Sequence, residues 1–391
     1  MLGKRIKQFR LAKGWSQDDL VAELGGIISK NALSKYERDK MKPSLSVLAK
    51  LAKAFDTKIL HLQNPPKITT EIVAYRKGSG LGIKNEERIE NLLRSELEER
   101  IRLMEKLGVV EEINLPVLDF QVNSLEDCEK VAEELRDFWE LGNNPIADLT
   151  ALLERNKIHV ILKDTVDKFD GISSLSKNDE GKVIAAAVVS RSNVKWSRQR
   201  LNLAHELGHL ILKVSPKIDE EKAAFRFGAA LLAPKESILE IIGKRRTTIQ
   251  FGELLQFKIQ FGISIQALIY RLGDLSIITP SYKARLFQII SKAGMRKNEP
   301  GELEIEKPMW LSNTVMRAFS EKIISANEAN KLLSKSNFKS ERKSLVQKSE
   351  FIKLSSIKKN ELLKTMADDA EGHYLTNSEW KEFLIGDFIE Y

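Results

Sequence analysis

The chain has 391 residues, 42% of them hydrophobic and 30% charged, a composition typical of a globular protein with more than one domain. Its single cysteine, Cys128, excludes an intrachain disulfide and a cysteine-based zinc site. The sequence contains no apolar run of membrane-spanning length and no apolar segment after the basic N-terminus. We therefore expect a cytoplasmic protein with no membrane partner.

The net charge of +8 is distributed unevenly along the chain. Residues 1–64 carry 13 Lys/Arg against 6 Asp/Glu, which indicates a polyanionic partner such as a nucleic acid. Residues 331–360 carry 9 basic against 2 acidic residues, and residues 361–391 carry 2 against 8. The simplest interpretation of these last two segments is solvated helical surface. A sharper hypothesis is that the acidic tail docks on a basic surface and restrains activity.

The first 64 residues read as a series of short helices separated by turn and capping residues. Gly14 is expected to end the first helix, and Ser16 to cap the second. Gly25 and Gly26 break that second helix, and Ser29 is placed to cap a third, polar helix, "KNALSKYERDK". A helix, a glycine-containing turn and a polar helix predict an all-α helix-turn-helix domain.

The stretch "SQDDLVAELG…ISKNALSKYERDKMKPSLSVLAKLAKAF" resembles the Cro/cI-type (Xre family) helix-turn-helix, although its turn holds one extra residue. The resemblance implies double-stranded operator DNA as a partner, and a homodimer because such operators are paired half-sites. Gln17 suits a phosphate contact. The residues expected to face the major groove are Ser29, Lys30, Asn31, Ser34 and Lys35. The alternative is a helical module that has lost DNA binding and contacts a protein.

The middle of the chain is expected to be α+β. Residues 65–83 have the composition of a linker, and "NDEG" between two apolar runs predicts a hairpin turn. The other elements expected here are helices over 85–108, 126–140 and 146–155 and a strand at 157–164. In such an arrangement an exposed strand edge can pair with an extended polypeptide. Residues 183–189 are the candidate for that edge, although an ordinary core strand is the simpler interpretation.

The stretch "RLNLAHELGHLIL" then places two histidines four residues apart. On a helix, His205 and His209 share one face, while Leu203, Leu207 and Leu210 lie on the opposite side. Two imidazoles on successive turns can bind one Zn²⁺ at about 2.0–2.1 Å each. Glu206, at the edge of that face, is the candidate general base for an attacking water.

A catalytic zinc site needs a third protein ligand, and the nearest candidates follow at "DEEKAAFRFGAALLAP". Asp219 and Glu220 fit the role of first-turn acids that the helix dipole favours. Periodicity alone leaves the ligand role open between Glu220 and Glu221. Gly228, in the middle of this helix, would allow it to approach the histidine helix closely.

The combination "RQRLNLAHELGHLILKV…EEKAAFRFGAALLAP" resembles the ImmA/IrrE family of zinc metallopeptidases, and the similarity extends over roughly residues 70–290. The resemblance implies a zincin-like fold, a Zn²⁺ cofactor and Glu221 as the third ligand. It also implies a protein substrate, a repressor above all. The sequence departs from the family pattern at Asn202, Gly228 and Ala233, none of which is a ligand or the base.

We therefore expect a multidomain protein: an all-α helix-turn-helix domain, an α+β zincin-like metallopeptidase domain and a mainly helical C-terminal region. The boundaries predicted from sequence are 1–64, 65–83 (linker), 84–290 and 291–391. The predicted function is a DNA-binding transcriptional regulator with a zinc endopeptidase that cleaves a regulator protein or itself. The alternative is a non-catalytic transcription factor that uses the peptidase-like domain as a ligand or metal sensor. Arg198 and Arg200 are candidates for oxyanion stabilisation or for structural roles.

Overall fold

A computed structural model describes residues 2–64, 68–77, 82–110, 113, 115, 119–163, 169–296 and 298–334. The basic and acidic segments beyond residue 334, with the hypothesis that the tail docks, lie outside the described residues. The chain divides into two compact units, residues 1–310 and 311–391. Among the described residues, no helix has both the length and the apolarity to cross a bilayer.

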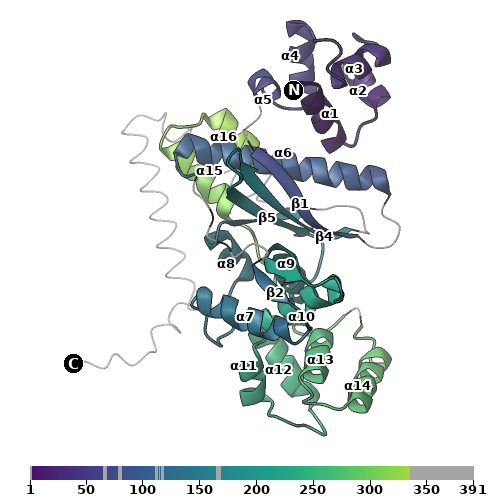
Figure 1. The fold of residues 1–391 in the computed structure, drawn as a ribbon, viewed down its shortest axis with the longest axis vertical. Coiled ribbons are helices and arrows are strands. Elements are labelled where there is room, and N and C mark those ends of the chain that lie inside the picture. Colours follow the sequence, from purple (N-terminus) through teal and green to yellow (C-terminus); the bar gives the residue numbers. More distant parts are fainter. Residues whose placement is uncertain are drawn as a thin grey trace, which may run out of the picture. The chain divides into compact units, whose positions relative to one another are not determined.

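The N-terminal region is all-α, as predicted (Figure 1). Its helices are α1 (Leu2–Ala12), α2 (Gln17–Glu23), α3 (Lys30–Glu37), α4 (Leu45–Ala54) and α5 (Ile59–Gln63). Ser16, Ser29 and Ser44 each accept a backbone N–H at a helix start, as expected for N-caps. Gly25 and Gly26, both with φ near +70°, turn the chain between α2 and α3. The core contains Ile6, Leu20, Leu33 and Leu51, all fully buried.

A four-stranded mixed sheet follows, in the order β1-β4-β5-β3. Its strands are β1 (Ile68–Lys77), β3 (Ile158–Lys163), β4 (Phe169–Asn178) and β5 (Val183–Arg191). β4 is antiparallel to both β1 and β5, and β3 is parallel to β5. The hairpin between β4 and β5 turns at Gly181, which has φ +81°, within the predicted "NDEG".

Two expectations for this sheet are wrong. The segment 65–83 is not simply a linker, because it contributes β1, which pairs along β4. The β-branched residues of "ITTEIVAY" favour a strand, but the proline and glycine residues on either side suggested a linker. Residues 183–189 are not an edge, because β5 is hydrogen-bonded to β4 on one side and β3 on the other. The simpler interpretation, a core strand, is therefore correct for β5.

Helices cover both faces of the sheet (Figure 1). α6 (Ile83–Leu107) packs Ile89, Leu93 and Leu97 on a cluster that includes Ile172 and Val189. The main core lies on the other face. It involves α7 (Asp127–Phe138), α8 (Leu149–Arg155), α9 (Trp196–Ile211) and α10 (Glu220–Leu232). A short parallel pair, β2 (Phe120–Val122) and β6 (Leu212–Val214), lies at the end of α9.

The helices that follow have a separate apolar core. They are α11 (Lys235–Ile241), α12 (Phe251–Phe261), α13 (Ile265–Asp274) and α14 (Pro280–Lys292). The chain turns between α12 and α13 at Gly262, with φ +66°. Within the described residues, it then continues through α15 (Trp310–Ser320) and α16 (Ala326–Leu333), the latter capped by Ser325.

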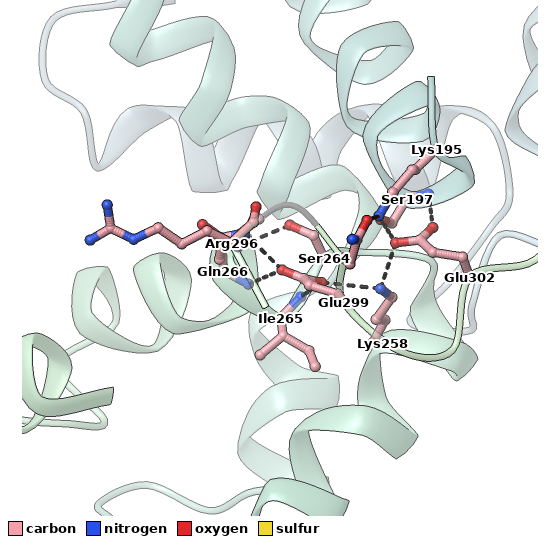
Figure 2. Close-up of polar contacts among 11 residues, drawn as sticks. Lys195, Ser197, Lys258, Ser264, Ile265, Gln266, Arg296, Glu299 and Glu302 are labelled. Carbon is pink, nitrogen blue, oxygen red and sulfur yellow. Dashed lines mark hydrogen bonds and ion pairs between the residues drawn. The ribbon is translucent and has the colours of Figure 1, made fainter. Parts of the chain in front are cut away.

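Residues 298–309, which the predicted boundaries place in the mainly helical C-terminal region, form an extended segment held by buried charges (Figure 2). Lys258 donates to Glu299 at 3.1 Å and to Glu302 at 2.6 Å. Glu299 also accepts the backbone N–H groups that begin α13, and Glu302 accepts from the backbone and hydroxyl of Ser197 at the start of α9. This acidic strap therefore fixes the first turn of the helix that carries His205.

Candidate metal centre

α9 brings the two histidines together because they are four residues apart on a buried helix. Its apolar side is anchored by Leu203, Leu207 and Leu210, which are fully buried in the main core. On the other side the rings of His205 and His209 face each other, with their Nε2 atoms 3.1 Å apart. Two imidazole nitrogens this close are favourable only when they share a proton or a metal ion.

α10 supplies the third donor. Glu221 places one carboxylate oxygen 3.4 Å from Nε2 of His205 and the other 3.4 Å from Nε2 of His209. Glu220 instead lies 3.2 Å from Nδ1 of His209, on the outer side of that ring. Asp219 caps α10 by accepting the N–H of Lys222. The three neighbouring acids thus differ in their contacts: Glu221 lies at the inner nitrogens of both imidazoles, Glu220 at the outer nitrogen of His209, and Asp219 at the start of α10.

Two glycines allow α9 and α10 to approach this closely. A Cβ built on Gly228 would lie 3.0 Å from the backbone nitrogen of His205, as the sequence led us to expect. A Cβ built on Gly208 would lie 3.2 Å from Cα of Ala224. Larger residues at either position would push the helices apart and separate Glu221 from the imidazoles.

The three donors fit a tetrahedral zinc ion. Bonds of about 2.0–2.1 Å at tetrahedral angles place neighbouring ligand atoms about 3.3–3.4 Å apart. Here the two imidazole nitrogens are 3.1 Å apart, and each lies 3.4 Å from its nearer Glu221 oxygen, Oε2 for His205 and Oε1 for His209. Donor atoms of His205, His209 and Glu221 all lie within 4.8 Å of one another. Two imidazoles and one carboxylate leave a fourth position for water, as in catalytic zinc sites.

The electrostatics also favour a cation. Hydrogen bonds from His205 and His209 hold the pKa of the Glu221 carboxyl well below its usual range, so this group remains an anion. Burial lowers the pKa of His209, but the carboxylates of Glu221, Glu206 and Glu220 outweigh burial and raise it. The carboxylates thus place negative charge next to the two buried imidazoles, which favours the binding of a cation there.

Glu206 is fully buried beside the histidines, and β4 holds it in place. The hydroxyl of Ser173 lies 2.5 Å from Oε2 of Glu206 and 2.9 Å from its main-chain oxygen. A Cβ built on Gly171 would collide with Oε1 of the same carboxylate. Neither Ser173 nor Gly171 was predicted from the sequence as a site residue. Both lie in the stretch "FDGISS", but only the folded sheet shows that they touch Glu206.

Arg200 has a structural role. It is buried and forms an ion pair with Glu306, and it donates to the backbone oxygen of Ile146 at 2.7 Å. The neighbouring Gln199 exchanges two hydrogen bonds with the backbone of Glu306. These contacts extend the acidic strap along α9, so Arg200 is committed to the fold and does not serve an oxyanion. Arg198 is exposed.

The predicted DNA-contacting residues gather on α2 and α3 but differ in availability. Asn31 and Lys35 are exposed one turn apart on α3. Lys30 is exposed but lies 2.7 Å from Asp18. Ser29 caps α3, and the hydroxyl of Ser34 accepts from Arg38. Gln17 donates to Glu37, which also pairs with the buried Arg10.

Comparisons with known proteins agree with this division of the chain. Residues 6–62 match the family described as helix-turn-helix, and residues 159–273 match a peptidase family, M78, described as IrrE N-terminal-like domain. The combination that the sequence resembled is confirmed, as is the multidomain fold with an α+β second part. The matches support a DNA-binding regulator with a metallopeptidase-type domain.

No curated protein matches the chain. Among solved structures, a mutant of PrgX matches over 84% of this chain and 98% of that chain, with 11% identity and a TM-score of 0.16. A similarity at that TM-score carries no argument about the fold.

Proposed function

We propose that this chain, which joins a helix-turn-helix domain to an IrrE N-terminal-like domain, is a DNA-binding transcriptional regulator with an active zinc endopeptidase. The carrying observation is that His205, His209 and Glu221 converge while the buried Glu206 lies beside them. The proposed substrate is a regulator protein, a repressor above all, or this chain itself.

Each residue has a distinct role in the proposed reaction. His205, His209 and Glu221 would hold Zn²⁺, which when bound supplies Lewis acidity at the scissile carbonyl and lowers the pKa of a coordinated water. Glu206 takes a proton from the attacking water and delivers it to the leaving nitrogen. Ser173 orients the Glu206 carboxylate by the contact at Oε2. Exclusion of bulk water around the buried Glu206 strengthens these interactions.

Zinc content tests the metal site directly. Purified wild-type protein is expected to hold one zinc ion per chain. Glu221→Ala is expected to bind zinc at least about 100-fold more weakly, a larger loss than is usual for a residue that only hydrogen-bonds a metal ligand. Elemental analysis and competition with a chelator measure both. The matched control is Asp219→Asn, which removes a carboxylate from the same helical turn but keeps the cap. Absence of zinc in reconstituted wild-type protein would contradict the proposal.

The DNA-binding half of the proposal rests on the exposed face of α3. Asn31→Ala is expected to weaken binding to an operator selected from random DNA by about 1–3 kcal/mol and to relax specificity at one position. Lys35→Ala should weaken binding too, and Lys50→Ala, an equal charge change on α4, should do so less. Titrations by fluorescence anisotropy measure these affinities. Unchanged binding of both α3 variants would favour a module that contacts only proteins.

We further propose that the chain binds DNA as a homodimer, because helices of this type read paired half-sites. Sedimentation of the protein with an operator of two half-sites would give two chains per duplex.

A further inference from the structure

β4 is the strand that lies closest to the proposed general base. Ser173 contacts the carboxylate of Glu206, and Gly171 lies so close to it that no side chain fits. On its inner side β4 pairs antiparallel with β5. Its outer edge is therefore the place where an extended polypeptide would add to the sheet next to Glu206.

That outer edge is filled by the chain itself. β1 pairs antiparallel with β4, and its register places Ala74 opposite Ser173 and Arg76 opposite Gly171. The two residues of β4 that touch Glu206 thus have β1 beside them on the outer edge and β5 on the inner edge. In sequence, β1 lies between α5 of the helix-turn-helix domain and α6.

β1 and β4 are joined by side-chain contacts at one end of β1, and their register is irregular at the other end, near Glu206. Thr70 and Ser176 share a hydrogen bond of 2.9 Å across the strands, and Lys177 pairs with Glu71 at 2.7 Å. Further along, the register shifts between Ile72 and Ala74 and again between Arg76 and Lys77. Such irregularities break the ladder and weaken local pairing. One such interruption lies directly beside the pair of Ala74 with Ser173.

We propose that the outer edge of β4 is the binding edge for an extended polypeptide substrate, and that β1 occupies it as an internal competitor. A substrate segment must displace β1 before its main chain can pair with β4 beside Glu206. The inference rests on the proposed peptidase function and adds to it a self-blocked substrate edge. β1 directly follows the helix-turn-helix domain in sequence, so the strand that blocks the edge is also the segment that connects this domain to the peptidase domain.

A reversible disulfide between β1 and β4 tests the inference in the full-length, zinc-loaded protein. Ile72→Cys with Ser174→Cys places two thiols opposite each other on the pair next to Ala74 and Ser173, at a cross-strand spacing that suits a disulfide. Cys128 does not compete, because it is buried and burial raises the pKa of its thiol to about 12. Acetohydroxamate probes the metal alone, and a peptidyl hydroxamate probes the metal together with the strand edge.

The oxidised double variant is expected to bind the peptidyl hydroxamate about tenfold or more weakly than the same protein after reduction, because the open form is no longer populated. Acetohydroxamate should bind both forms equally. Ile72→Asp, which removes apolar contact from β1, should bind the peptidyl probe more tightly than wild type. The single Ser174→Cys variant, oxidised in the same way, controls for the treatment.

Equal peptidyl affinity in the oxidised and reduced forms would overturn the inference while leaving the zinc site intact. So would a peptidyl probe that binds no form when acetohydroxamate binds all of them. Failure of every form to hold zinc or acetohydroxamate would instead overturn the proposed function, and the inference with it.

Discussion

Replacing Glu206 by Gln is expected to lower peptide cleavage by about 10²–10⁴-fold while zinc content is unchanged, since the general base is lost but the metal donors remain. Gln keeps the size of the side chain and can still accept from Ser173, so the buried position stays filled. It cannot take a proton from water at neutral pH. The measurement is cleavage of fluorescein-labelled casein by zinc-loaded protein, beside elemental analysis.

Glu220→Gln is the matched control for this variant. Glu220 is on the neighbouring helix, contacts only the outer nitrogen of His209 in the described contacts, and its side chain is 63% exposed. It should lose far less activity than Glu206→Gln. A Glu206→Gln protein that cleaves, and regulates transcription, at the wild-type level would support the alternative of a non-catalytic sensor.

Replacing Lys258 by Met is expected to destabilise the protein by about 3–5 kcal/mol, the usual cost of breaking a buried ion pair by removing one partner. The Lys258 side chain is fully buried, and both of its partners, Glu299 and Glu302, lose their counter-charge at once (Figure 2). The strap would then lose its anchor on α12, while its hydrogen bonds to Ser197 and Gln199 on α9 remain. Urea unfolding followed by circular dichroism measures the loss of free energy of unfolding.

Two comparisons separate the ion pair from side-chain packing. Lys182→Met removes an exposed lysine whose ion pair with Glu180 is worth at most about 1 kcal/mol. Lys258→Met combined with Glu299→Gln and Glu302→Gln removes the uncompensated charges and should recover part of the stability. A loss below about 1 kcal/mol for Lys258→Met alone would show that the strap carries little of the stability.

Local features of this protein were predictable from sequence because they depend on residues a few positions apart. The caps at Ser16, Ser29 and Ser325 follow from the hydrogen-bonding needs of a helix start, and all three are present. The pairing of His205 with His209 follows from the helical period alone. The turn at Gly181 follows from its preference for positive φ between two apolar runs.

The third donor shows where local reasoning ends. Glu220 and Glu221 are adjacent on one helix turn, and periodicity does not choose between them. Their distances to the two imidazoles differ because of how α10 packs across α9, and that packing depends on Gly228 and Gly208. The resemblance to a known family implied Glu221 as the third ligand. The packing of α10 across α9 gives the physical reason for its short distances to both imidazoles.

Only the tertiary structure decided which strand lies at an edge, which residues support Glu206, and what residues 298–309 do. The β-branched residues of β1 favour a strand, but its partner β4 lies about a hundred residues further along the chain, so only the folded sheet shows the pairing. The contacts of Ser173 with Glu206 and of Arg200 with Glu306 likewise join distant residues. Helices and turns are encoded by neighbours in the chain, whereas strand partners and buried ion pairs are fixed only when the whole core forms.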